Sequence, residues 1–195
     1  MNKESFDDEE NFQKESYKQS RGQSFFSEVL KFTLIAIFVV LPIRFFIAEP
    51  FIVSGASMEP SFETGDYLII DKISYRFHEP ERGDVIVLKY PLDKSRFFIK
   101  RIVGLPGEAI NIVNGEVFVI KDGVEEKINE PYVRATVIES LKLDLGEDEY
   151  FVMGDNRPVS LDSRSWGILK KELIKGKPFI RLLPITKIGT YPGLM

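Results

Sequence analysis

The feature that most constrains this chain is its apolar stretch, residues 25–48. The uncharged centre, 32–43, would form a helix only about 18 Å long, whereas the hydrocarbon core of a bilayer is about 30 Å thick. The whole stretch would reach about 36 Å, and Glu28, Lys31 and Arg44 lie near its ends, where long side chains can extend toward the headgroups. We therefore expect one N-terminal transmembrane helix over 25–48.

Two other interpretations of this stretch remain open: a cleavable signal peptide and a buried helix of a soluble protein. Ser54 and Ala56 form a small-x-small pair after which a signal peptide could be cut. Residues 1–24 are polar and mixed in charge, without the compact basic start of a signal peptide, so we expect a flexible tail. The lysines and arginines of that tail favour a cytoplasmic position, which would leave 49–195 outside the cytoplasm.

After Pro50 the sequence changes to short runs rich in β-branched and aromatic residues. The pairs Asn114-Gly115 and Asp122-Gly123 each separate two such runs, which indicates tight hairpins. No helical period of useful length appears before 170–174. The soluble part is therefore predicted to be mainly β. Strands are expected at 67–70, 84–88, 97–103, 109–113, 116–120, 124–128 and 149–152.

Segment 105–150 carries little that suggests chemistry. Its portion 131–147 has the polar, turn-rich character of a variable loop joining hairpins. We expect the segment to be a structural insert.

The composition excludes several kinds of site. The 195 residues include no cysteine, which rules out a disulfide, a thiolate metal site and a cysteine nucleophile. The single histidine, His78, cannot supply the nitrogen ligands of a zinc site by itself. A formal charge of −4 argues against a nucleic-acid partner. We expect no metal and no organic cofactor.

Ser57 lies among small residues at a turn, in the stretch VSGASMEPS (53–61). A serine hydroxyl needs a base to become a nucleophile, and serine-glycine turns are common, so the stretch alone is weak evidence of catalysis. Lys100 is a candidate base because its apolar neighbours, FFIKRIV, can lower a lysine pKa through desolvation. It could equally be an ordinary strand-edge lysine. A Ser/His/Asp mechanism would have to use His78, which is otherwise a surface histidine.

Four stretches together resemble the type I (leader) signal peptidases of bacteria and organelles, and the likeness runs from about Phe45 to the C-terminus. These stretches are 53–61, 65–72, 98–108 and 154–164. The resemblance implies a Ser/Lys β-fold catalytic domain over 49–195, with a β-hairpin insert at 105–150. Ser57 in Ser-Met-x-Pro matches the family's nucleophile, and Lys100 in Lys-Arg-Ile-Val-Gly matches its general base. The implied function is a membrane-bound serine endopeptidase that cleaves signal peptides from exported precursor proteins after a small-x-small site.

The resemblance also implies supporting residues. Ser160 matches a serine whose hydroxyl holds the catalytic lysine, while Asp162 and Arg164 match an acid and a base that pair near the site. The alternative for that pair is a purely structural ion pair. Some relatives carry an oxyanion-binding serine where this chain has Gly55, so the backbone N–H of Ser57 is the expected donor here.

Three residues beside the dyad in sequence, Met58, Phe98 and Ile99, are candidates for an apolar substrate pocket, or else ordinary core. Asp155 is assigned no chemical role. Two rival functions remain: a soluble self-cleaving repressor-type protease joined to a DNA-binding module, and a non-catalytic, membrane-anchored β-domain that binds a partner. The apolar stretch and the acidic tail argue against the first. Replacing Ser57 with alanine would separate a peptidase from the second.

Overall fold

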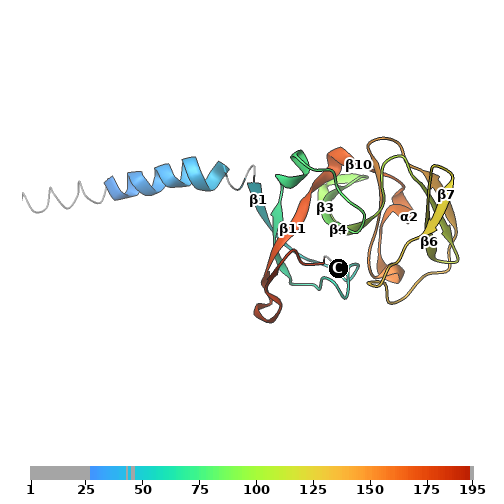
Figure 1. Ribbon diagram of the computed structural model, residues 1–195. Coiled ribbons are helices and arrows are strands. Elements are labelled where there is room, and N and C mark those ends of the chain that lie inside the picture. Colours follow the sequence, from blue (N-terminus) through green and yellow to red (C-terminus); the bar gives the residue numbers. More distant parts are fainter. Residues whose placement is uncertain (1–26, 43, 45–46, 194–195) are drawn as a thin grey trace, which may run out of the picture. The chain divides into compact units, whose positions relative to one another are not determined.

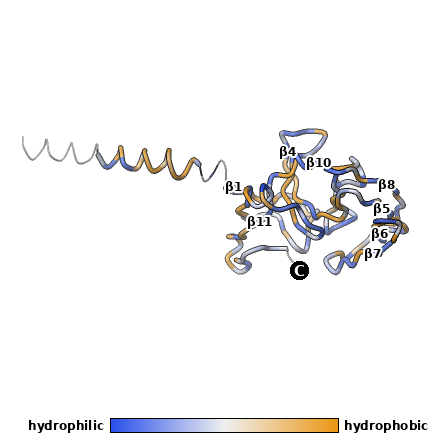
Figure 2. The backbone as a smooth tube through the Cα atoms, turned by 45° about the horizontal axis from the view of Figure 1, so that its top comes forward, coloured by the Kyte–Doolittle hydropathy of each residue, from blue (hydrophilic) through white to orange (hydrophobic). Residues whose placement is uncertain are grey.

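A computed structural model describes residues 27–42, 44 and 47–193. The chain divides into two units, 1–46 and 47–195, each described here by itself. In the first unit residues 27–42 are helical and include the π-helical turn η1 (Ala36–Val40); much of this helix is hydrophobic (Figure 2). Within the described ranges, no helix has both the length and the apolarity needed to cross a bilayer. The expected tail at 1–24 lies outside the described residues.

The second unit is built mainly from antiparallel strands, as expected from the sequence (Figure 1). Its larger sheet has eight strands in the order β1-β2-β11-β3-β4-β9-β10, and β12 pairs with β11 beside this path. These strands are β1 (Ala48–Ile52), β2 (Tyr67–Asp71), β3 (Val85–Tyr90), β4 (Asp93–Gly104), β9 (Glu149–Met153), β10 (Leu169–Lys170), β11 (Ile174–Leu183) and β12 (Gly189–Thr190).

The smaller sheet has four strands in the order β7-β6-β5-β8 and lies within the expected insert. Its strands are β5 (Ala109–Val113), β6 (Glu116–Lys121), β7 (Val124–Lys127) and β8 (Leu141–Asp144). Both predicted hairpins are confirmed: Asn114 and Gly115 have φ of 53° and 83°, and Asp122 and Gly123 have φ of 52° and 78°. Positive φ at both central residues matches the twist of the flanking strands.

The sequence pattern missed some strands. Strand β8 falls inside the expected loop at 131–147, where it pairs with β5. The expected helical segment at 170–174 is wrong: it holds the end of β10, the 3-10 turn η5 (Lys171–Leu173) and the start of β11. The long strand β11 escapes the alternation rule because two register shifts interrupt its pairing with β2, and because Gly176 allows the backbone of β11 to approach the carbonyl of Asp71 closely.

Strand β3 is buried on both faces. Val85 and Val87 join the core cluster that contains Phe62 and Leu68. Ile86 and Leu88 point to the opposite face and join a second cluster with residues of β9 and β10. Because β4 pairs with this strand along most of its length, the neighbouring residues of β4 are held in a rigid setting.

Candidate active site

The turn that carries Ser57 connects β1 to β2 and is closed at its base. The backbone N–H of Val53 donates to the carbonyl of Asp66 (2.9 Å), and a hydrogen bond from Gly65 to Val53 (2.9 Å) completes the closure. Met58, with 1% of its surface exposed, packs into the core next to Ser57. Ser57 itself is half-buried. The buried methionine therefore fixes the turn and leaves the serine at its surface.

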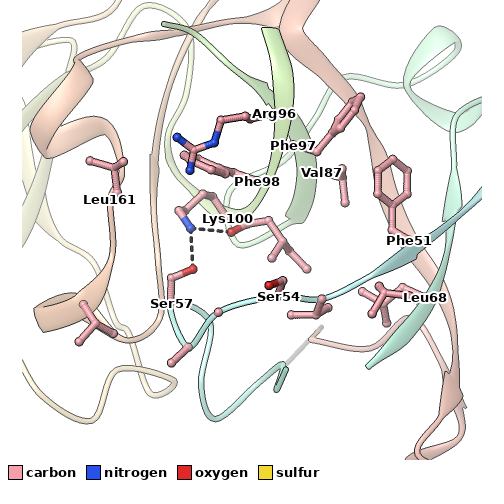
Figure 3. A pocket seen from close by; sticks show the side chains of 16 residues that line it. Phe51, Ser54, Ser57, Leu68, Val87, Arg96, Phe97, Phe98, Lys100 and Leu161 are labelled. Carbon is pink, nitrogen blue, oxygen red and sulfur yellow. Dashed lines mark hydrogen bonds between the residues drawn. The ribbon is translucent and has the colours of Figure 1, made fainter. Parts of the chain in front are cut away.

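Strand β4 brings Lys100 to this serine. Lys100 Nζ lies 2.7 Å from Ser57 Oγ and also donates to the carbonyl of Ile99 at 2.9 Å (Figure 3). The lysine is only 3% exposed. Burial lowers the pKa of Lys100 from 10.5 to about 8, although the carboxylates of Asp162 and Asp155 act in the opposite direction.

This geometry suits proton transfer. When the amine of Lys100 is neutral, it can accept the hydrogen bond of the Ser57 hydroxyl and then its proton. A lysine with an unperturbed pKa would be charged at neutral pH and could not do so. The pair has the separation and the protonation equilibrium of a nucleophile with its general base.

Asp162 and Arg164 form the expected ion pair. Asp162 is fully buried and accepts from Arg164 Nε (2.7 Å) and Nη2 (2.8 Å), and from the backbone N–H of Gly154 (3.0 Å). Burial would raise the pKa of Asp162, but the hydrogen bonds and charge of Arg164, the hydroxyl of Ser160 and the backbone N–H of Gly154 together hold that pKa below its usual range. Asp162 also caps the short helix α2 (Ser163–Trp166). The pair therefore braces the segment beside the dyad.

Ser160 lies close to the dyad but makes no hydrogen bond to Lys100. Its Oγ is buried and meets no hydrogen-bond geometry among the described residues, but it lies near enough to the Asp162 carboxylate to help lower the pKa of that group. A methyl group on Gly154 would overlap both this Oγ and the carbonyl oxygen of Ser57. Gly154 thus permits Ser160 and the backbone of Ser57 to approach each other, which places the Ser160 hydroxyl beside the site.

The structure shows a clamp on the Ser57 turn that the sequence did not reveal. The backbone N–H of Asn156 donates to the carbonyl of Ser57 (3.0 Å), and its side-chain amide donates to the carbonyl of Ala56 (3.0 Å). The preceding residue, Asp155, is fully buried and forms a bidentate pair with Arg101 at 2.9 and 2.7 Å. The segment 155–156 therefore binds both the turn that carries Ser57 and Arg101, the residue that follows Lys100.

Asp155 also extends this clamp. It accepts a hydrogen bond from Ser61 Oγ at 2.6 Å. The paired Arg101 is buried, donates to the carbonyls of Gly83 and Gly193, and stacks 4.1 Å from the ring centroid of Tyr132. Asp155, which sequence reasoning left without a role, is thus a structural partner of the site. The only local signal was its position at the start of the stretch 154–164, which also carries Ser160, Asp162 and Arg164.

Two further ion pairs tie the insert to the same segment. Arg157, in the 3-10 turn η4 (Arg157–Val159), contacts Glu130 at 3.2 Å through Nη1. Arg164 contacts Glu139 at 2.6 Å. The loop between β7 and β8 is therefore bonded to the braces of the dyad.

The dyad opens into a cavity of about 270 Å³ (Figure 3). Of the three pocket candidates, Phe98 and Ile99 line this cavity, whereas Met58 lies in the core and does not line it. The other lining residues come from the Ser57 turn, from the neighbouring strands, and from η4 and the loop after it: Phe51, Ile52, Val53, Ser54, Gly55, Ala56, Leu68, Val87, Arg96, Phe97, Val159 and Leu161. His78 is exposed and is not among them.

The backbone around Ser57 is suited to receive an oxyanion. Within the described residues, the N–H of Ser57 donates to no protein group. The N–H of Gly55 is already engaged with Thr64 Oγ1 at 3.0 Å, and Ser54 is exposed at the cavity wall. A Cβ atom added to Gly55 would have no atom within 4 Å, so there is room for a side chain at this position. Its φ of 102°, however, is a backbone conformation that favours glycine.

Comparisons with known proteins agree with this geometry. Residues 26–183 match the family described as "Signal peptidase, peptidase S26". A probable signal peptidase I-2 of Synechocystis sp. is 36% identical over 88% of this chain and 80% of its own length. A signal peptidase I of Leptolyngbya laminosa is 34% identical over 88% of this chain and 86% of its own. Signal peptidase I P of Bacillus subtilis subsp. natto is 33% identical over 88% of this chain and 96% of its own length. Since the match extends over most of the sequence, this chain belongs to the signal peptidase family, peptidase S26, whose members are serine endopeptidases.

Proposed function

We propose that the protein removes N-terminal signal peptides from exported precursors after a small-x-small site, with Ser57 as nucleophile and Lys100 as general base. Neutral Lys100 takes the proton of Ser57 as its Oγ attacks the scissile carbonyl, and the oxyanion forms against the backbone N–H of Ser57. Lys100 then gives the proton to the leaving amine. Water, activated by the same lysine, hydrolyses the acyl-enzyme.

One observation carries this proposal: a buried lysine, with a pKa lowered to about 8, lies 2.7 Å from a serine hydroxyl at the mouth of an apolar cavity. A lysine on the surface would stay charged at neutral pH, and a serine with a purely structural role would not need to lie at an open cavity. The apolar lining suits small uncharged side chains of the substrate. Asp162 and Arg164 brace the site, and we assign Ser160 the role of positioning Lys100.

We further propose that residues 25–48 anchor the protein in the membrane, with 1–24 in the cytoplasm and 49–195 outside it. Apolar side chains of the helical region are open to their surroundings: Phe32 and Phe38 are 71% and 72% exposed. An apolar surface of this kind is favourable in lipid and costly in water. The segment would hold the dyad on the surface where signal peptides emerge.

The test is cleavage of a purified precursor by the full-length protein in detergent, followed by identification of the new N-terminus. The wild-type protein should cut once, after a small-x-small site. Ser57→Ala should abolish the cut. So should Lys100→Arg, because a guanidinium cannot accept the proton. A Ser57→Ala protein that still cleaves would refute the assignment of the nucleophile, whereas a wild-type protein that only binds the precursor would favour a binding module.

A further inference from the structure

A second positive charge lines the same cavity as the dyad. Arg96 lies on β4, four residues before Lys100. Among the lining residues these two are the only ionisable side chains. Lys100 is 3% exposed, whereas Arg96 is exposed, so Arg96 supplies the accessible charge of the cavity wall.

Aromatic rings hold the Arg96 guanidinium in place. Its Cζ lies 5.2 Å from the ring centroid of Phe98 and 5.6 Å from that of Tyr90. These two rings are stacked at 4.8 Å, and Trp166 packs against both at 5.3 and 5.7 Å. In the part of the chain that the structure describes, Arg96 has no carboxylate within ion-pair distance. The charge of Arg96 also acts on the Asp93 carboxylate, three residues before it, but no ion pair between them is formed, so the guanidinium N–H groups can bind a further carboxylate.

The alternation of β4 divides the cavity. Arg96 and Phe98 lie on the side of Lys100, with Leu161 across from them, while Phe97 packs edge-on against Phe51 at 5.3 Å on the other side (Figure 3). A small-x-small preference requires the residues one and three positions before the cut to enter an apolar cavity beside the nucleophile. The cavity that contains Arg96 is therefore the one that receives the segment before the cut.

The distance along β4 sets the position that Arg96 would meet. Four strand residues span about 13 Å, which is also the length of about four residues of an extended substrate. Resting on the proposed function, we infer that Arg96 is a specificity-determining residue that favours substrates with a carboxylate side chain four to six residues before the cleavage site. An arginine that already rests against aromatic rings loses less freedom than an unsupported one when it binds a carboxylate in its fork.

The test uses the full-length protein in neutral detergent with peptides that share an Ala-x-Ala site. Pairs of peptides differ only by Asp or Asn at position −4, −5 or −6, and one control pair carries the change at +3. The measured quantity is the ratio of kcat/KM for Asp over Asn within each enzyme. At low salt the wild-type ratio should be about twofold to fivefold at one position among −4 to −6, and near one at +3. It should fall toward one at 1 M salt, where the screening length is about 3 Å.

Variants then assign the preference to Arg96. Arg96→Ala should bring the ratio to about one, and Arg96→Glu should turn it below one. Lys94→Ala is the matched control: this exposed lysine lies two residues away on β4 but does not line the cavity, so the wild-type ratio should persist.

Four outcomes would overturn the inference. A wild-type ratio of one at −4 to −6, with both peptides cleaved, refutes it and leaves the proposed function standing. A ratio that Lys94→Ala abolishes as completely as Arg96→Ala would reflect general surface charge. A protein in which Arg96→Ala weakens only binding to anionic vesicles would assign Arg96 to lipid instead. Failure of the wild-type protein to cleave any peptide refutes the proposed function and, with it, this inference.

Discussion

The pH dependence of cleavage offers the most direct measure of the Lys100 environment. If the pKa of Lys100 is about 8, roughly 9% of the enzyme carries a neutral lysine at pH 7 and roughly 90% does so at pH 9. The rate should therefore rise about tenfold between these pH values and level off above pH 9. With the ordinary pKa of 10.5, the neutral fraction would be about 0.03% at pH 7 and about 3% at pH 9. The rise would then be about a hundredfold, with no plateau.

The assay is kcat/KM for a peptide with an Ala-x-Ala site, measured from pH 6 to pH 10 at constant ionic strength. In the free enzyme this profile reports the essential base. A profile that still rises severalfold between pH 9 and pH 10 would refute desolvation of Lys100, because a pKa of about 8 leaves almost no rise there whereas the ordinary pKa of 10.5 gives about eightfold. His78→Ala serves as the control and should leave the profile unchanged. A break near pH 6.5 that this variant removes would make the histidine the base and end the Ser/Lys interpretation.

Four further predictions concern the support of the site. Because the pKa of Lys100 is lowered, the unfolded chain between pH 8 and pH 10.5 holds a proton that the folded protein has lost. The free energy of unfolding of the wild-type protein, measured by chemical denaturation, should therefore rise by about 3 kcal/mol over this window. Lys100→Met should lack this rise. Asn156→Ala should lower kcat about tenfold or more with little change in KM, and should cost about 1 to 2 kcal/mol of stability, because one carbonyl of the nucleophile turn loses its donor. Gly154→Ala should abolish peptide cleavage, since its methyl group would occupy the contact between two active-site segments; full activity would show that this contact is dispensable. A truncated protein beginning at Ile47 should keep its fold by circular dichroism and cleave soluble peptides, whereas one beginning at Phe51 should be less stable, because it lacks three of the five residues of β1.

Features of the fold that depend on local chemistry could be predicted from the sequence. The two hairpins follow from Asn-Gly and Asp-Gly pairs, and seven strands follow from their β-rich runs. Strands β1 and β11 could not be found in this way. The first begins at the end of the apolar stretch and contains Glu49 and Pro50, and the second is interrupted by bulges, Gly176 and Pro178, so neither shows a clean period of two.

In the site, too, some features could be predicted from sequence motifs and others depend on contacts between distant segments. Four ordered motifs were enough to predict the pairing of Ser57 with Lys100, and the structure brings the two together across 43 positions of sequence. The role of Asn156 could not be predicted, because it depends on a carbonyl 100 residues away. The role of Arg96 could not be predicted either. It lies in a polar stretch of sequence, and only the fold places its guanidinium over the rings of Tyr90 and Phe98 beside the dyad.

The ion pairs from Arg157 and Arg164 to the insert bear on how this enzyme could be re-engineered. A chimera that exchanges only the hairpins β5 to β7 would leave Glu130 and Glu139 in place, and both arginines would keep their partners. A chimera cut at 105 and 150 would remove both carboxylates. Arg157 and Arg164, which are 2% and 8% exposed, would then lose these partners, and Arg164 is the residue that pairs with Asp162. Exchange boundaries at 108 and 128 are therefore the safer choice, because the segment 129–140 belongs mechanically to the catalytic core although it lies within the insert.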